Sequence, residues 1–279
     1  MTEEQRQFPK PIEAFVVIIS SFIFILLVTQ SILLLVSQNP EQLDTTSSNM
    51  KLLITFGEAG LIIIPLLYIK RKKYPITRVF RWKKIPMRMI LWSLVIGLSI
   101  TIIGDELDRI ISIIIPAPDF LAEMAEAMRI KSLADLLILS SGAVLAAAFV
   151  EESIIRGFLQ ISLEKYQDVT RAVIYASLAW TIIHGMLYWA IQIFLLGIIL
   201  GLLAWRSDSI FPSVIGHAIN NSAALIFYNV DQQIFEGIYL WGDHVSALFL
   251  LPAGLGLVYG IKAFYQHYRK LPESPFSPN

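Results

Sequence analysis

The sequence of 279 residues contains no cysteine. This absence excludes disulfides, zinc sites with thiolate ligands and a cysteine nucleophile. Charged residues are scarce at 16%, whereas hydrophobic residues make up 56% and the mean hydropathy is +0.64. Soluble domains carry about a quarter charged residues, so this composition is typical of a protein that crosses a membrane several times. The formal net charge is zero, and we expect no nucleic-acid partner.

Several sequence signals are also missing. The first ten residues lack the basic region and cleavage site of a signal peptide, so we expect the first apolar segment to remain in the mature protein. Neither HExxH nor GxSxG occurs, so the two commonest hydrolase motifs are absent. There is no long repeat, and the Pro- and Ser-rich end of the chain is expected to be disordered.

Long apolar segments dominate the rest of the chain. Their length and flanking charges predict an all-α, polytopic membrane protein with about eight transmembrane helices. The predicted spans are 12–36, 52–69, 89–104, 133–163, 172–189, 191–205, 210–228 and 245–265.

The connection 70–88 indicates the orientation, since it holds nine Lys and Arg residues and no acid. Under the positive-inside rule this loop is cytoplasmic, and eight spans then place both termini in the cytoplasm. An alternative role for the loop is contact with anionic lipid head groups. We therefore expect a cytoplasmic tail at 1–11, an eight-span domain at 12–268 and a second cytoplasmic tail at 269–279, in the cell membrane if the host is prokaryotic.

Two adjacent glutamates, Glu151 and Glu152, interrupt the apolar segment LAAAFVEESIIRGFLQ. A charge at the bilayer centre costs roughly 2.5–3.5 kcal/mol on insertion scales, so such residues indicate a functional site. Arg156 lies four residues after Glu152, a spacing that places the two on one helix face. Adjacent helical residues point about 100° apart. Glu152 is thus expected to pair with Arg156, while Glu151 stays free for chemistry.

Other rare polar residues fall at the same depth. His184 lies in the predicted span 172–189, and His217 and Asn221 share one helix face in 210–228. Counting from the span ends at 1.5 Å per residue places Glu151 and these three side chains about 10–18 Å from the cytoplasmic surface. We therefore expect three helices to bring them together in one layer.

Such a cluster can support hydrolysis. A carboxylate in an apolar site can act as a general base, and an asparagine can donate a hydrogen bond to an oxyanion. Two histidines and a carboxylate also suit a catalytic zinc, with Glu151, His184 and His217 as possible ligands. The alternative is structural, because histidines and Glu–Arg pairs within membranes also join helices by hydrogen bonds.

Three motifs carry a resemblance to a known family. EESIIRG is similar to the EExxxR motif of the CPBP intramembrane proteases, which include CAAX prenyl endoproteases and bacteriocin-processing proteins. WTIIH, from Trp180 to His184, matches FxxxH with tryptophan in place of phenylalanine. HAINN, from His217 to Asn221, matches HxxxN, and the motif-bearing resemblance covers about 145–228.

The resemblance implies a membrane endopeptidase. Glu151 would activate water with His184 as its partner, and His217 and Asn221 would form the oxyanion site or hold the water. Glu152 and Arg156 would shape and neutralise the site, and Trp180 would affect substrate fit. The family is described both as metal-dependent and as metal-free, so a divalent metal such as zinc stays an open cofactor. The expected partners are the lipid bilayer and a peptide or protein substrate, either prenylated CAAX peptides or other membrane-associated precursors.

Two other functions remain as alternatives. The same cluster would suit a non-enzymatic regulator that binds a partner membrane protein, or a proton-coupled transporter. The transporter is less favoured because no inverted repeat is found. Glu58, inside the span 52–69, matches no motif, and a structural role is the preferred interpretation. The segment 116–131 has the apolar spacing of an amphipathic helix on the outer surface. A lid is one role for it, and a packed loop is the preferred interpretation.

Overall fold

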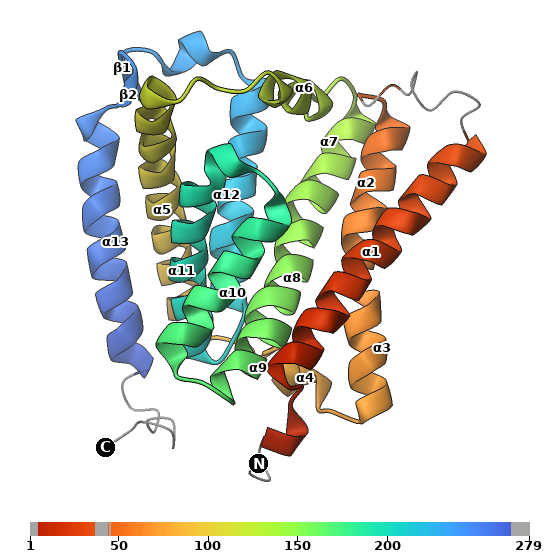
Figure 1. Cartoon of the computed structure of the whole chain (residues 1–279). Coiled ribbons are helices and arrows are strands. Elements are labelled where there is room, and N and C mark those ends of the chain that lie inside the picture. Colours follow the sequence, from red (N-terminus) through yellow and green to blue (C-terminus); the bar gives the residue numbers. More distant parts are fainter. Residues whose placement is uncertain (1–4, 37–43, 45, 269–279) are drawn as a thin grey trace.

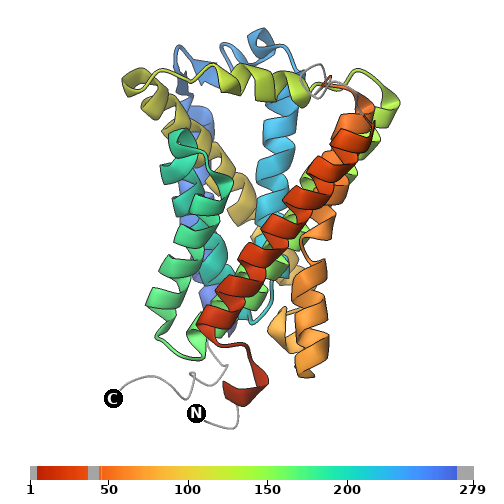
Figure 2. The same ribbon diagram turned by 45° about the vertical axis from the view of Figure 1, so that its right-hand side comes forward.

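The computed structural model describes residues 5–36, 44 and 46–268. The described residues are almost entirely helical and form a bundle that α1 crosses obliquely (Figures 1 and 2). The long helices are α1 (Pro11–Val36), α2 (Ser48–Gly60), α3 (Ile63–Lys72), α5 (Met87–Ile114), α10 (Val169–His184), α11 (Ala190–Ser207), α12 (Phe211–Asn229) and α13 (Ala247–His267). The predicted all-α polytopic fold is confirmed.

Shorter elements connect them. They are η1 (Gln5–Gln7), α4 (Ile76–Val79), α6 (Phe120–Ala127), η5 (Leu187–Trp189), η6 (Gln232–Phe235) and the antiparallel strands β1 (Leu240–Trp241) and β2 (His244–Val245). The α6 helix lies across the end of the bundle opposite α4 (Figure 2). It forms the central part of the amphipathic segment predicted at 116–131, and none of its residues is buried.

Within the described residues, six helical segments are long and apolar enough to cross a membrane. They are Gln5–Val36, Ser48–Lys72, Met87–Ile114, Leu133–Glu164, Leu187–Ser207 and Ala247–His267. The other two predicted spans correspond to α10, which has only 16 residues, and α12. These two helices carry His184, His217 and Asn221, and they pack against α11 and α5. Neighbouring helices cover part of their surface, so α10 and α12 can cross a membrane with side chains that are less apolar than those of the other spans. That they do cross it stays a prediction.

The loop 70–88, the N-terminal end of α1 and the C-terminal end of α13 lie at the same end of the bundle (Figure 1). An even number of crossings would produce this arrangement. The beginning of the first expected tail and all of the second, 269–279, lie outside the described residues. Which side of the membrane this end faces stays a prediction.

The second predicted span is divided into α2 and α3. Proline has no N–H, so Pro65 leaves the carbonyl of Leu61, four residues earlier, without its helical hydrogen bond. The Ser21 hydroxyl of α1 donates to that carbonyl. A side chain from a neighbouring helix thus satisfies the backbone at the break, as an apolar environment requires.

The segment Leu133–Glu164 is one long helix whose hydrogen-bonding pattern changes along its length. It comprises α7 (Leu133–Leu139), the π-helical η3 (Ser140–Ala146), α8 (Ala147–Glu152), the π-helical η4 (Ser153–Leu159) and α9 (Gln160–Glu164). π-helical turns are rare and occur frequently at functional sites. The two adjacent glutamates lie at the end of the short α-helical part between them.

Arg81 shows that the basic loop does more than set the topology. Its side chain is 4% exposed and forms ion pairs with Glu164 and Asp208, the latter at 3.6 Å. Burial lowers the pKa of Arg81, but the pairing with Glu164 and Asp208 outweighs it and the pKa lies above its ordinary value. The guanidinium also donates to the carbonyl of Arg156 at 3.3 Å. The loop is therefore anchored to the helix that carries the paired glutamates.

Candidate active site

The pair expected from the sequence, Glu152 and Arg156, is present and completely buried. Arg156 Nη1 donates to Glu152 Oε1 at 2.8 Å, and both side chains have 0% exposure. His217 of α12 contacts the same oxygen through Nδ1 at 3.0 Å. Because a carboxylate oxygen accepts, Nδ1 is the nitrogen that carries the hydrogen. Glu152 is thus neutralised by Arg156 and held by His217, which leaves it unsuited to act as a base.

Trp180 lies at the centre of the cluster. Its ring centroid is 4.9 Å from that of His184 and 5.3 Å from that of His217, and the Arg156 guanidinium stacks over it at 4.2 Å. Its indole Nε1 donates to Glu151 Oε2 at 2.6 Å. Only 3% of Trp180 is exposed. From the sequence we expected it to affect substrate fit, whereas the structure shows that it also holds the free glutamate in place.

Glu151 and His184 face each other beside the cluster. His184 Nε2 lies 3.7 Å from Glu151 Oε2, and His184 Nδ1 lies 2.8 Å from the Trp180 carbonyl oxygen. A carbonyl can only accept, so Nδ1 carries the hydrogen, and the neutral tautomer then leaves Nε2 as an acceptor toward Glu151. The His184 side chain retains 29% exposure and the Glu151 side chain 17%. They are therefore the accessible polar groups of the cluster.

A cavity of about 230 Å³ opens beside Glu151 and His184. Its wall is mostly apolar and comes from α1, α2 with the residue that follows it, α8, η4 and α10. The apolar and aromatic lining residues are Phe22, Leu61, Ile154, Ile155, Trp180 and Ile183. Its polar lining residues are Glu58, Glu151 and His184.

Asn221 differs from the expectation. Its Nδ2 donates to the carbonyl oxygen of Ala143 in η3 at 3.0 Å, and it does not line the cavity. It shares α12 with His217, as the spacing predicts. His217 also does not line the cavity, because Glu152 and Trp180 surround it. The oxyanion role expected of these two residues therefore has no support in this arrangement, in which they fix the helix that carries Glu151.

Glu58, for which the sequence favours a structural role, is also found beside Glu151 and His184. It lies on α2, more than 90 residues before the paired glutamates, yet it lines the same cavity. The available signal was an unmatched acid in an apolar span, which by itself indicates function. The structural interpretation was preferred because no motif included it.

The residues do not fit the zinc site considered above. Among the described residues no group of three His, Cys, Asp or Glu side chains is arranged to hold a metal ion. His217 is bound to Glu152, and the Trp180 ring packs against both His217 and His184. Glu151, His184 and His217 therefore do not form a set of metal ligands in this arrangement.

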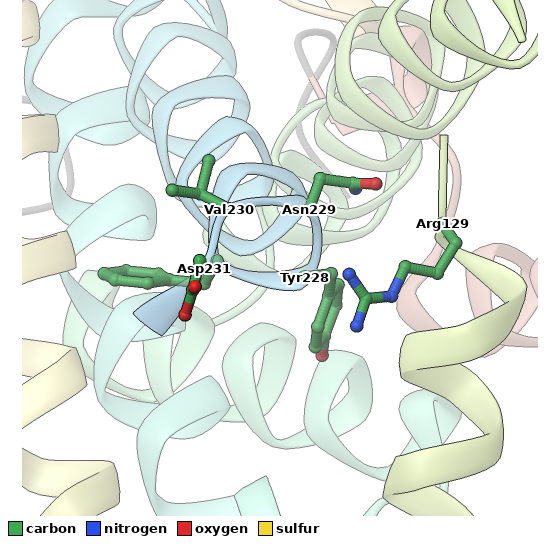
Figure 3. Close-up of a pocket in the computed structure, with 6 residues that line it drawn as sticks. Arg129, Tyr228, Asn229, Val230 and Asp231 are labelled. Atoms are coloured by element: carbon green, nitrogen blue, oxygen red, sulfur yellow. The ribbon is translucent and has the colours of Figure 1, made fainter. Parts of the chain in front are cut away.

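A second cavity, of about 570 Å³, lies at the C-terminal end of α12 (Figure 3). Its lining includes Arg129 and Tyr228, whose side chains lie side by side. Asn229, also in its wall, donates to the carbonyls of Met128 and Leu225 and accepts from the Ile130 amide. These bonds tie the α6–α7 connection to α12. The wall offers no nucleophile or base paired as Glu151 and His184 are.

These observations define a class of protein: an all-α, polytopic membrane protein with glutamates and histidines buried between its helices. Residues 133–223 match the family model Rce1-like, described as type II CAAX prenyl endopeptidase Rce1-like. The match confirms the family resemblance that the three motifs indicate, and it includes all seven site residues predicted from them. The helices α1 to α6 and α13 lie outside the matched segment. No curated protein and no solved structure matches the chain.

Proposed function

We propose that this protein is an intramembrane endopeptidase in which Glu151 activates a water molecule to hydrolyse a peptide bond of a membrane-associated substrate. One observation carries the proposal: of the two adjacent glutamates, Glu152 is buried against Arg156 and His217, whereas Glu151 faces an apolar cavity beside His184. The family match supports the same class of reaction.

The geometry suggests how the water is held. Glu151 Oε2 and His184 Nε2 are both hydrogen-bond acceptors, and they are 3.7 Å apart. A water that donates one hydrogen to each of them directs its oxygen lone pair toward a carbonyl carbon in the cavity. The Trp180 N–H and the Trp180 carbonyl fix the two acceptors. Glu151 then takes a proton as the water attacks, as a general base does.

The buried residues behind this pair act as positioning residues. Arg156, Glu152 and His217 join η4, α8 and α12 through charge-assisted hydrogen bonds. Arg156 also supports the Trp180 ring. The water, its two acceptors and Trp180 are thereby held with little freedom before substrate enters, which is how preorganised sites lower a barrier.

The proposed substrate is a peptide or protein segment that reaches the cavity from the membrane. Prenylated CAAX peptides form one class, and other membrane-associated precursors form the second. We propose that the basic loop 70–88 and both termini face the cytoplasm, as the positive-inside rule indicates.

The test uses the purified full chain in detergent with farnesylated CAAX peptides and membrane-peptide precursors. Glu151→Gln keeps the shape of the side chain but removes the base, and it should lower kcat by about 100-fold or more. Glu123→Gln is the matched control, because Glu123 is exposed on α6, away from the cavity. Each assay is run with and without a strong chelator.

Cleavage that requires Glu151 and survives chelation supports the proposal. Cleavage by the Glu151→Gln variant at the wild-type rate refutes it. If an effect on a partner membrane protein persists in that variant, the chain acts as a non-enzymatic regulator. Proton-gradient-dependent flux in proteoliposomes would instead indicate a transporter.

A further inference from the structure

The carboxyl of Glu58 lines the same cavity as Glu151 and His184, although Glu58 lies far earlier in the sequence, on α2. It stands on α2, two residues before that helix ends at Gly60. Its Oε1 is buried and has no hydrogen-bond partner among the described residues. Gly57 and Gly60, on either side of it, pack against Ile25 of α1. The helix is thus held close to α1, and Glu58 is directed to the cavity that α1, α2, α8, η4 and α10 enclose.

The three glutamates in and beside the cavity, Glu58, Glu151 and Glu152, differ in their partners. Glu152 has a cation, Arg156, and Glu151 has the indole N–H of Trp180. The buried Oε1 of Glu58 has no donor and no cation beside it among the residues that the structure describes. An ionised carboxylate without a partner in apolar surroundings is strongly disfavoured, and such a group takes up a proton instead. A neutral carboxylic acid in this position offers the cavity a hydrogen-bond donor.

Peptide-bond hydrolysis requires such a donor. After water adds to the carbonyl carbon, the C–N bond breaks only if the departing nitrogen receives a proton. Of the other two polar groups of the cavity, Glu151 holds a proton only after the water has attacked, and His184 is an acceptor in its neutral form, so Glu58 is the group that can hold a proton before the reaction begins. The buried His217 and the half-buried Asn221 do not line the cavity.

We propose that Glu58 is a catalytic residue that protonates the leaving amine, with Glu151 as the base. This inference rests on the proposed function. The water oxygen bonds to the carbonyl carbon while its proton moves to Glu151 and the carbonyl electrons move to oxygen. When the carbonyl re-forms, the C–N bond breaks, its electron pair stays on nitrogen, and nitrogen takes the Glu58 proton. The proton on Glu151 then passes to Glu58 through water in the emptied cavity, which restores both groups.

Few titratable groups influence this transfer. From the elements around the cavity, Glu58 faces Glu151 of α8 and His184 of α10. The lining from α1 is Phe22, and the lining from η4 is Ile154 and Ile155. The pH dependence of turnover should therefore reflect Glu58, Glu151 and His184 acting together.

The kinetic test compares Glu58→Gln and Glu58→Leu with wild type, Glu151→Gln and the control Glu123→Gln, all as full chains. Both Glu58 variants should lower kcat by about 100-fold or more with KM changed less than about threefold, and the alkaline limb of the kcat profile should disappear. Because the buried Oε1 of Glu58 has no partner to lose among the described residues, Glu58→Leu should keep the wild-type melting temperature or exceed it. If Glu58→Gln retains activity, the proton-donor role is wrong.

A second readout does not depend on activity. Infrared spectra at neutral pH should show the C=O stretching band of a protonated carboxyl in wild type and Glu151→Gln, and this band should be missing in Glu58→Gln. If no peptide is cleaved by wild type, the proposed function fails but the band still decides whether Glu58 holds a proton. A band that persists in Glu58→Gln overturns the inference, as does a band lost only in Glu151→Gln.

Discussion

Replacing Arg156 with methionine should destabilise the protein strongly, because it removes one partner of a completely buried ion pair. The Arg156 Nη1 to Glu152 Oε1 distance is 2.8 Å, and neither side chain is exposed. Methionine keeps much of the volume, so the packing against the Trp180 ring is largely retained. What remains is a buried carboxylate whose only polar partner among the described residues is His217. Breaking a buried pair in this way costs about 3–5 kcal/mol.

The assay is reversible unfolding in bicelles or detergent, measured for Arg156→Met, Glu152→Gln and the double variant. The double variant leaves no uncompensated charge, so it should recover more than half of the stability that Arg156→Met loses. If the losses of the two single variants simply add in the double variant, the pair is not coupled and the reasoning is refuted. A loss below about 1 kcal/mol in Arg156→Met would show that the site is hydrated, as in an exposed pair.

Trp180→Phe keeps an aromatic ring but removes the N–H that donates to Glu151 Oε2 at 2.6 Å. The loss of one hydrogen bond to a charged group should lower kcat by about 10- to 100-fold with little change in melting temperature, measured on any cleaved peptide. Unchanged kcat would argue against a positioning role. Gly97→Ala should destabilise the α5–α12 contact by about 1–3 kcal/mol, because its Cβ would lie 2.9 Å from the Gly216 Cα. Gly254→Ala is the matched control, since no atom lies within 4 Å of its added Cβ, and equal melting temperatures for the two variants would contradict the packing argument.

Local spacing made part of the site predictable. A separation of four residues places Glu152 and Arg156 on one helix face whatever surrounds them, and the salt bridge is present. The pair survives although η4 is π-helical. Counting depth along separate spans also brought Glu151, His184 and His217 into one layer, because the rise per residue of a helix is nearly constant.

Rotation of the helices about their axes was not predictable in this way. Depth places His217 and Asn221 near the glutamates, but packing decides that His217 binds Glu152 and that Asn221 binds the Ala143 carbonyl. The π-helical segments on both sides of α8 change the direction of its side chains, and neither composition nor apolar spacing indicates them.

By itself, the sequence determined the membrane class, the helical fold and the polar residues of the three motifs, since composition, apolar length and local spacing depend only on neighbours in the chain. Spacing indicated which glutamate is paired, but tertiary structure alone decided that the other one, Glu151, faces a cavity and accepts a hydrogen bond from Trp180. It also brought Glu58 of α2 to the site. The physical reason is that partners distant in sequence are chosen by helix packing, and packing depends on the shapes of all the helices together.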